Sequence, residues 1–215
     1  MQFDYIFLPK MSGKNRITIM KITPLRKGLP DKLNLGCGRY PIAGYLNVDR
    51  DRAACPDRAI DLNHIPYPFP PNSFAVVEAR HVLEHLHDVF SVMREIHRIL
   101  KPGGTVRIAV PHFSRGMTHA DHKRCFDLSF PYYFKPEFLG GYCGVQFELV
   151  SQKFIWWGLR DLKKSILPLP VRILGSLVGE VFDLAANLCP ALCSRVWCFW
   201  VGGFEEIRFV LRKPN

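Results

Sequence analysis

Two glycines and one aspartate near the start of the chain have the types and spacing of a nucleotide-binding turn. The segment Leu33–Gly38 reads LNLGCG, a short apolar strand that ends in a Gly-x-Gly turn. Glycine lets the backbone turn sharply and approach a ligand with no Cβ in the way. The segment Leu46–Asp49 reads LNVD, a second strand that ends in a carboxylate. Asp49 can accept hydrogen bonds from both hydroxyls of a ribose, so the two segments predict a nucleotide-type ligand.

A second group of chemically active side chains follows a later apolar strand and consists of His112, His119, Asp121 and His122. Histidine suits a general base because its pKa lies near 7. Loops at the carboxyl ends of parallel strands are also where such sheets bind ligands. We therefore predict these four as catalytic residues of an acceptor pocket, with Asp121 orienting one histidine. A bound metal, or plain packing of hydrogen-bonded histidines, is the alternative for this cluster.

The segment His81–His85 reads HVLEH and matches the inverted zinc-protease pattern H-x-x-E-H. Zinc would need both histidines on one helical face and a third ligand from elsewhere. The motif follows directly after an apolar strand of a nucleotide-type sheet, which argues against a protease. A zinc hydrolase stays a remote alternative. We expect no metal ligands in the site and no dependence of activity on zinc.

The segments around these groups alternate between strands and helices. Apolar residues recur with helical spacing over His85–Leu100, and Lys101–Gly104, which reads KPGG, ends that helix. Strand, helix and strand in this order predict a parallel sheet with helices on its faces. The predicted strands are Lys32–Leu35, Tyr45–Val48, Ala59–Leu62, Phe74–Val77, Thr105–Val110, Phe147–Trp157 and Glu206–Arg212.

The segment Leu33–Val110 resembles the core of the class I S-adenosylmethionine-dependent methyltransferases, especially the small "type 11" group. The matching stretches read LNLGCG, LNVD, IDLN, HVLEHL and RILKPGG. The resemblance implies S-adenosylmethionine as the cofactor. It also implies an α/β fold, with a Rossmann-like, mostly parallel seven-stranded sheet, helices on both faces, an antiparallel last strand and a helical insertion before it. The interval from Gly36 to Asp49 is shorter than the roughly 20 residues of a dinucleotide fold, which argues against an NAD enzyme.

The resemblance also implies roles for single residues. Gly36 and Gly38 would lie against the methionine part of the cofactor, and Asp49 would hold the ribose. Asp61 and Leu62 would border the adenine. His81, which stands just past the fourth strand, would line the methyl-transfer pocket. The predicted cofactor-binding residues are Asn34, Gly36, Cys37, Gly38, Asp49, Asp61, Leu62 and His81.

Length and composition suit one domain, since the chain has 215 residues and 48% are hydrophobic. We predict a basic N-terminal arm or edge strand at 1–30 and a methyltransferase domain at 31–215.

The net charge of +10 sits mainly on the two ends, where no nucleic-acid-binding module is recognisable, so nucleic acid is not the favoured partner. Seven cysteines, an odd number, and no visible signal peptide predict a cytoplasmic protein.

An apolar insertion is predicted at about 159–203, before the last strand. Its prolines, Pro168, Pro170 and Pro190, predict two or three short helices. Apolar residues punctuated by cations suit a helix that lies on an anionic membrane surface, here the inner membrane face. A cap packed on the sheet and a homodimer interface are the alternatives.

These features together predict an enzyme that methylates a small-molecule, glycan or lipid-linked acceptor. The acceptor would attack the sulfonium methyl in line, while the protein supplies position and alignment. We expect O-methylation with a histidine as base. A non-catalytic relative that serves as a binding or partner subunit is the alternative.

Overall fold

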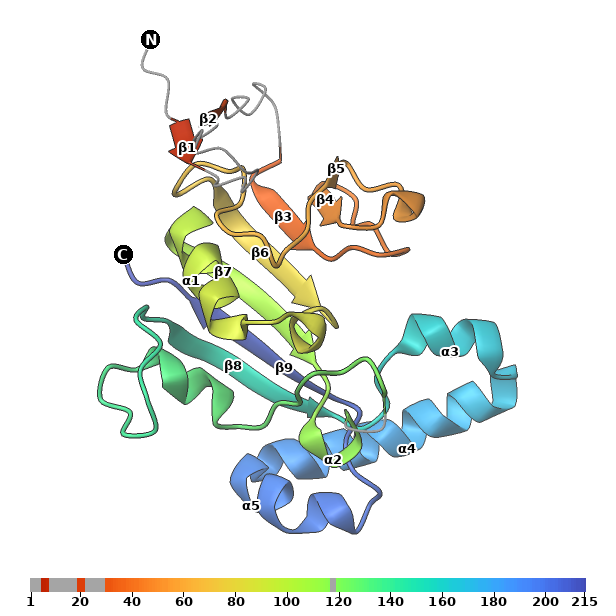
Figure 1. Ribbon diagram of the computed structural model, residues 1–215. Helices are drawn as coiled ribbons and strands as arrows, with labels where there is room; N and C mark the ends of the chain where they lie inside the picture. Colours follow the sequence, from red (N-terminus) through yellow and green to blue (C-terminus); the bar gives the residue numbers. More distant parts are fainter. Residues whose placement is uncertain (1–4, 8–18, 22–29, 117–118) are drawn as a thin grey trace.

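The computed structural model describes residues 5–7, 19–21, 30–116 and 119–215 (Figure 1). Its main sheet has seven strands in the order β5-β4-β3-β6-β7-β9-β8. Neighbouring strands from β5 to β7 are parallel, and β9 is antiparallel to both β7 and β8. The predicted seven-stranded, mostly parallel α/β sheet is therefore confirmed. The strands are β3 (Lys32–Leu35), β4 (Leu46–Asp49), β5 (Arg58–Ala59), β6 (Phe74–Arg80), β7 (Leu100–Val110), β8 (Glu148–Ile155) and β9 (Glu206–Arg212).

The helices are short except for two. The α-helices are α1 (Val89–Ile99), α2 (Phe113–Gly116), α3 (Arg160–Ile166), α4 (Leu169–Leu188) and α5 (Pro190–Arg195). The 3₁₀ turns are η1 (Arg52–Ala54), η2 (Leu83–His85), η3 (Phe130–Phe134) and η4 (Trp197–Phe199).

Helix α1 begins later than its apolar pattern predicts because a side-chain cap sets its start. The carboxylate of Asp88 accepts hydrogen bonds from the backbone N–H groups of Phe90 and Ser91. Such a cap stabilises a helix by about 1 kcal/mol. The apolar stripe of α1, which includes Met93 and Ile96, is fully buried against the sheet.

The main sheet has two unlike faces because successive side chains of a strand point to opposite sides. Val77, Val106 and Leu211 are cross-strand neighbours on one face, and all three are buried in the apolar core. Figure 1 shows α1 lying over this sheet. The next row places Glu78 beside Arg107 on the opposite face, where they form an ion pair.

The helices differ in one respect from the predicted arrangement on both faces. In the described part of the chain, α1 packs on the apolar face and α4 lies along the edge of β8, whereas the charged face exposes residues such as Arg107. The connection between β3 and β4, residues 36–45, forms only turns. A parallel crossover usually needs a dozen or more residues to include a helix, and this one is too short.

The predicted insertion is helical, but one of its helices is long. Helix α4 has 20 residues, because Pro168 and Pro170 stand at its first turn rather than inside it. Proline is favoured there, since its missing N–H has no partner within the helix. Asn187 of α4 accepts a hydrogen bond from the N–H of Phe154 at 2.8 Å and donates one to its carbonyl at 3.0 Å. Side chains of α4 thus satisfy the open edge of β8.

Part of the predicted N-terminal arm forms a small sheet of its own. Tyr5–Phe7 (β1) and Ile19–Lys21 (β2) pair as a separate antiparallel sheet, while residues 1–4, 8–18 and 22–29 of the predicted N-terminal arm lie outside the described residues. No helix among the described residues is long and apolar enough to cross a membrane.

Candidate cofactor and acceptor site

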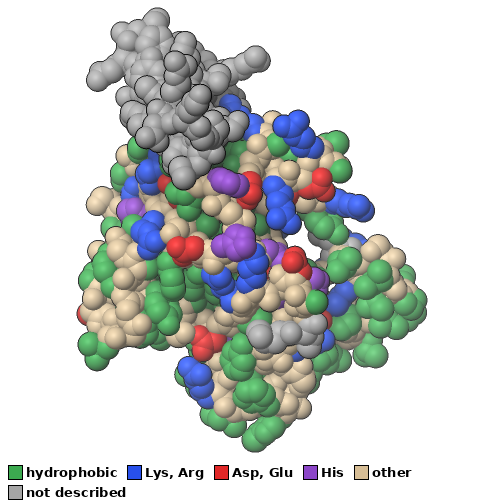
Figure 2. Space-filling model, viewed as in Figure 1, with side chains coloured by type: hydrophobic (Ala, Val, Ile, Leu, Met, Phe, Trp, Pro, Cys, Tyr) green, Lys and Arg blue, Asp and Glu red, His purple; other side chains and the backbone are tan. Residues whose placement is uncertain are grey.

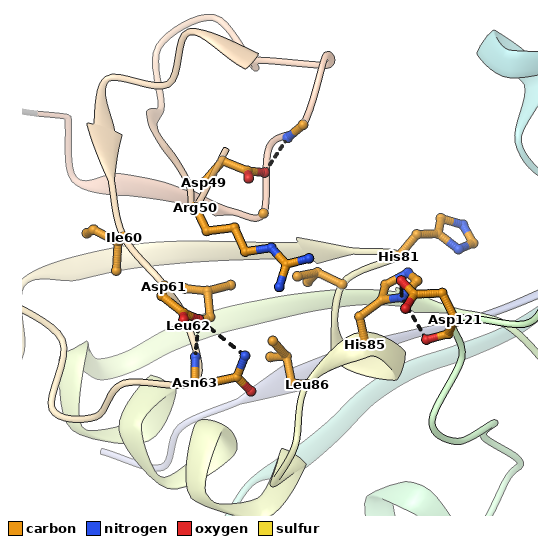
Figure 3. A pocket seen from close by; sticks show the side chains of 13 residues that line it. Asp49, Arg50, Ile60, Asp61, Leu62, Asn63, His81, His85, Leu86 and Asp121 are labelled. Atoms are coloured by element: carbon orange, nitrogen blue, oxygen red, sulfur yellow. Dashed lines mark hydrogen bonds and ion pairs between the residues drawn. The ribbon is translucent and has the colours of Figure 1, made fainter. Parts of the chain in front are cut away.

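A cavity of about 260 Å³ opens where β3, β4 and β6 end (Figure 3). Parallel sheets bind ligands at this edge because the carboxyl ends of their strands and the following loops converge there. The cavity is lined by Gly36, Gly38, Asp49, Arg50, Ile60, Asp61, Leu62, Asn63, His81, Val82, His85, Leu86 and Asp121.

The turn after β3 requires glycine on two counts. Gly36 and Gly38 have φ of +63° and +48°, in the region that other residues rarely adopt. A Cβ on Gly36 would lie 2.4 Å from Cγ2 of Val82, whereas a Cβ on Gly38 would meet nothing within 4 Å. Gly36 therefore lets the chain pass close to Val82, and Gly38 leaves open space for a ligand.

Asp49 is held rigidly at the end of β4. Its Oδ2 accepts a hydrogen bond from the N–H of Gly38 at 2.8 Å, and its Oδ1 accepts one from the N–H of Asp51 at 2.9 Å. Each carboxylate oxygen keeps a further lone pair, so a pair of vicinal hydroxyls can still bind. The geometry suits the predicted ribose contact.

The loop after β5 forms a second wall of the cavity. Oδ1 of Asp61 accepts hydrogen bonds from the backbone N–H and the side-chain amide of Asn63. The backbone N–H of Asn63 is the main cause that lowers the pKa of Asp61, with a smaller contribution from His64. Leu62 is buried beside them and offers an apolar surface.

His81 brings a positive charge to the cavity wall. Its Nε2 lies 2.6 Å from Oε2 of Glu206, and its Nδ1 lies 3.4 Å from Oε1 of Glu84. Burial alone would lower the pKa of His81, but the hydrogen bond to Glu206 and the nearby carboxylate of Glu84 outweigh it and raise the pKa to about 9. At neutral pH His81 is therefore an imidazolium and cannot act as a base.

The segment that builds this cavity matches a known family. Residues 33–108 match the model of the family described as "Methyltransferase domain". These residues form a class I S-adenosylmethionine-dependent methyltransferase domain. S-adenosylmethionine is the cofactor of this family, and all the residues that line the cavity except Asp121 belong to the matched segment.

Individual relatives match the methyltransferase domain over limited lengths. Methyltransferase str3 of Strobilurus tenacellus is 34% identical over 103 residues, covering 39% of this chain and 36% of that protein. The uncharacterized protein YafE of Escherichia coli (strain K12) is 51% identical over 37 residues, covering 17% of this chain and 18% of that protein. The chain thus covers well under two thirds of both relatives.

A solved structure extends the likeness of fold to most of the chain. A SAM dependent methyltransferase from Archaeoglobus fulgidus superimposes with a TM-score of 0.53 at 17% identity, covering 87% of each chain. This similarity confirms the fold beyond the methyltransferase domain itself.

Two residues predicted to bind the cofactor lie outside the cavity of this methyltransferase domain. Nδ2 of Asn34 donates a hydrogen bond to Oδ1 of Asn47 at 3.0 Å, so Asn34 ties β3 to β4 on the charged face of the sheet. Cys37 lies between the two glycines, but its side chain points into the protein and is buried, which raises the pKa of its thiol. The other six predicted residues all line the cavity.

His112, one of the four residues predicted as catalytic, lies in the core instead. Its side chain is fully buried, with Nδ1 2.7 Å from Oγ of Ser114 and the ring packed against Phe154. Burial lowers the pKa of His112 to about 4, so the imidazole is neutral at pH 7 and has no access to an acceptor. Because side chains alternate along an extended chain, His112 points to the same side as Val110, the buried last residue of β7.

The other predicted catalytic residues gather at the mouth of the cavity. The rings of His119 and His122 stack 4.5 Å apart, and the ring of His122 lies 5.0 Å from that of His85. Asp121 lines the cavity and lies 2.9 Å from Nδ1 of His85. Asp121 thus orients His85 rather than the histidines predicted beside it. We refer to His85, His119 and His122 as the histidine group.

Sequence reasoning missed three polar residues of the cavity, namely Arg50, Asn63 and His85. Arg50 follows Asp49 directly, and its side chain extends into the cavity (Figure 3). The sequence signal that could have identified Arg50 is its position directly after Asp49, the last residue of β4. His85 was noticed only as part of the zinc-protease pattern.

The zinc-protease arrangement of HVLEH is not formed. Leu83–His85 is a single 3₁₀ turn, and His81 stands before it with φ of +48°. His81 and His85 therefore do not share a helical face, which the protease reading requires.

Proposed function

We propose that the protein transfers the methyl group of S-adenosylmethionine to a hydroxyl oxygen of a lipid-linked acceptor at an anionic membrane surface. One observation carries the proposal: a single cavity joins the Gly-x-Gly turn and Asp49 at one end to His85 and Asp121 at the other. The first end suits the cofactor, and the second suits activation of an acceptor. Small molecules and free glycans are the other acceptor classes considered.

The reaction is a direct displacement. The acceptor oxygen attacks the sulfonium methyl in line, a C–O bond forms, the C–S bond breaks, and S-adenosylhomocysteine leaves. The hydroxyl proton passes to a base. Holding the two reactants in line accounts for most of the acceleration in such a reaction, so a rigid cavity is the main requirement.

His119 is the base we propose from the histidine group. It is exposed at the mouth of the cavity, and its Nδ1 accepts a hydrogen bond from the N–H of Asp121 at 3.4 Å. Nδ1 is then the unprotonated nitrogen of the neutral ring, so Nδ1, held only by this long contact, is the atom that would take the acceptor proton. His112 and His81 are unsuitable because one is buried and the other is already protonated.

The membrane part of the proposal is supported by the apolar surface of the helical insertion. Helix α4 fully buries only Gly179 and Ala186, and although Phe182 packs on Trp156, most of its large apolar side chains are exposed. Figure 2 shows hydrophobic side chains gathered over α3 and α4, with lysines and arginines among them. The exposed apolar residues of this surface are Leu162, Ile166, Leu169, Val171, Ile173, Leu174, Leu177, Val181, Leu184, Leu188, Leu192, Phe199 and Trp200.

A groove of about 300 Å³ between α3 and α4 adds a reason to favour an anionic lipid. Trp157, Ile173 and Leu177 give it an apolar lining, and Arg160 and Arg172 stand at it as cations. An acyl chain with an anionic head group complements both parts of this lining. A homodimer through the same surface is the alternative that a test must separate.

Methyl-labelled S-adenosylmethionine tests the proposed reaction. The full chain would be incubated with panels of lipid-linked sugars, free glycans and small hydroxyl compounds, and label in each product measured. We expect label in the lipid-linked class. Transfer to a soluble class would correct the acceptor, while cofactor binding by calorimetry without transfer to any panel would favour a non-catalytic subunit.

A further inference from the structure

The structure assigns a binding site for a divalent transition-metal ion to Glu84, His85 and His122, beside the cofactor cavity. Glu84 and His85 come from η2 after β6, and His122 comes from the loop after β7. One ligand atom from each of the three residues lies within 4.8 Å of the other two. Ligand atoms that each lie about 2.0–2.2 Å from one tetrahedral ion are roughly 3.4 Å from one another. Small side-chain rotations would bring the three ligand atoms to that separation.

Both histidines are oriented as metal ligands usually are. Nδ1 of His85 lies 2.9 Å from Oδ2 of Asp121, and Nδ1 of His122 lies 2.8 Å from the carbonyl oxygen of Gly116. A carboxylate or carbonyl acceptor places the proton on Nδ1 and leaves the lone pair of Nε2 for a ligand. Metal-binding histidines commonly have such a partner on their other nitrogen.

Glu84 provides the independent observation that points to a cation. Its side chain is fully buried, and neither carboxylate oxygen takes part in a hydrogen bond. Its ion pair is with His81, whose Nδ1 lies 3.4 Å from Oε1. A buried carboxylate is costly unless it is paired and hydrogen-bonded, and a bound ion would satisfy its free lone pairs.

The ligand types indicate which ion fits. Two imidazoles and one carboxylate suit zinc and similar transition metals, whereas calcium and magnesium prefer oxygen ligands alone. Three protein ligands also leave a fourth position open. His85 lines the cofactor cavity, so the ion would lie beside that cavity.

The role of the ion rests on the proposed function. An acceptor hydroxyl at the open position would be held by the ion and would lose its proton more easily, because a bound cation lowers the pKa of a coordinated oxygen. His119, which stacks on His122 but is not a ligand, would then receive the proton. The expectation from sequence that the site holds no metal is replaced by this proposal.

Calorimetry with zinc chloride tests the site without any methyl transfer. The full chain, first dialysed against a strong chelator, should bind one equivalent of Zn²⁺. Glu84→Gln and His122→Ala should each weaken Zn²⁺ binding by about 100-fold or more, and Asp121→Asn by about 10–100-fold as a loss of orientation. His87→Ala is the matched control, because His87 is a nearby exposed histidine outside the ligand set.

Two results would overturn the site: wild-type Zn²⁺ affinity no higher than that of the double variant Glu84→Gln/His122→Ala, or an equal loss in His87→Ala. If a variant fails to fold, the melting temperature of the wild-type protein still tests the site. Saturating Zn²⁺ must raise this melting temperature if Zn²⁺ binds the native state. Calorimetry with S-adenosylmethionine on the same samples separates the two proposals, because cofactor binding should persist in the ligand variants.

Discussion

Nδ1 of His85 lies 2.9 Å from Oδ2 of Asp121, so a residue that follows β6 is joined to one in the loop that follows β7. The adjacent parallel strands β6 and β7 deliver both side chains to one edge of the sheet. This pair lies at one end of the cavity whose other end is built by Gly36, Gly38 and Asp49, and it is the end that we propose for the acceptor. The arrangement leads to five predictions.

Asp49→Ala should weaken binding of S-adenosylmethionine by about 1–3 kcal/mol, the usual loss for hydrogen bonds to a charged group. The fold should survive, because Asp49 ends its strand at the ligand edge. Calorimetry measures the loss. Asp51→Ala is the control, since Asp51 caps η1 and does not line the cavity. Unchanged affinity in Asp49→Ala would remove this carboxylate from the site.

Gly36→Ala should destabilise the protein by about 1–3 kcal/mol, because alanine is strained at positive φ and its Cβ meets Val82 at 2.4 Å. Gly38→Ala should cost less, since only the φ angle opposes it. Urea denaturation measures both. The double variant Gly36→Ala/Val82→Ala should recover part of the loss. No recovery would mean that the contact with Val82 is unimportant.

Acidification should unfold the protein partly through His112. Its pKa is about 4 in the folded state against 6.5 when exposed, so the native state binds fewer protons than the unfolded state between these values. Stability is therefore complete above about pH 6.5 and falls as the pH drops toward 4, by roughly 3 kcal/mol in total.

Denaturation curves at several pH values check the contribution of His112. His112→Asn should flatten the dependence between pH 6.5 and 4, because asparagine has no proton to gain. His87→Asn is the control, since His87 is an exposed histidine outside the core. Equal slopes in wild type and His112→Asn would contradict the assignment.

His119→Ala should lower turnover on a hydroxyl acceptor by about 100-fold or more, the usual effect of losing a general base. Cofactor affinity should stay nearly intact, because His119 does not line the cofactor cavity. Steady-state kinetics and calorimetry measure the two quantities, with His87→Ala as the control. Equal losses in both would instead indicate a packing role for His119.

Leu177→Glu/Leu184→Glu should reduce binding to anionic liposomes by about tenfold or more, because burial of a leucine side chain stabilises by about 1.5–3 kcal/mol. Both side chains lie exposed on α4. Leu139→Glu is the matched control, since Leu139 is fully exposed in the loop before β8. Flotation at low salt gives the readout.

The homodimer alternative predicts a different outcome for the same variants. Wild-type protein that stays at the bottom of the gradient, yet sediments as a dimer that Leu177→Glu/Leu184→Glu dissociates, would replace the membrane proposal.

The cofactor end of the site was predictable from sequence because its determinants are local. A Gly-x-Gly turn after an apolar strand constrains the backbone wherever it occurs, and Asp49 ends the next strand in register with it. The bounds of β3 and β9 match their predictions for the same reason, since short apolar runs carry their own propensity. Helix α1 was predictable from the helical spacing of its apolar residues, although the capping residue Asp88 sets where the helix begins.

The acceptor end depended on tertiary contacts that no local pattern encodes. Sequence grouped His112 with His119 and His122 because they are near in the chain, yet His112 is buried in the core and His119 lies exposed in the loop after α2. The carboxylate of Asp121 pairs with His85 rather than with the histidines next to it in the chain. Glu84 lost access to water through packing, which composition alone cannot reveal. Local propensity thus determined the turn that suits the cofactor, whereas the parallel pairing of β6 with β7 and the packing around their ends decided which polar groups meet and which are buried.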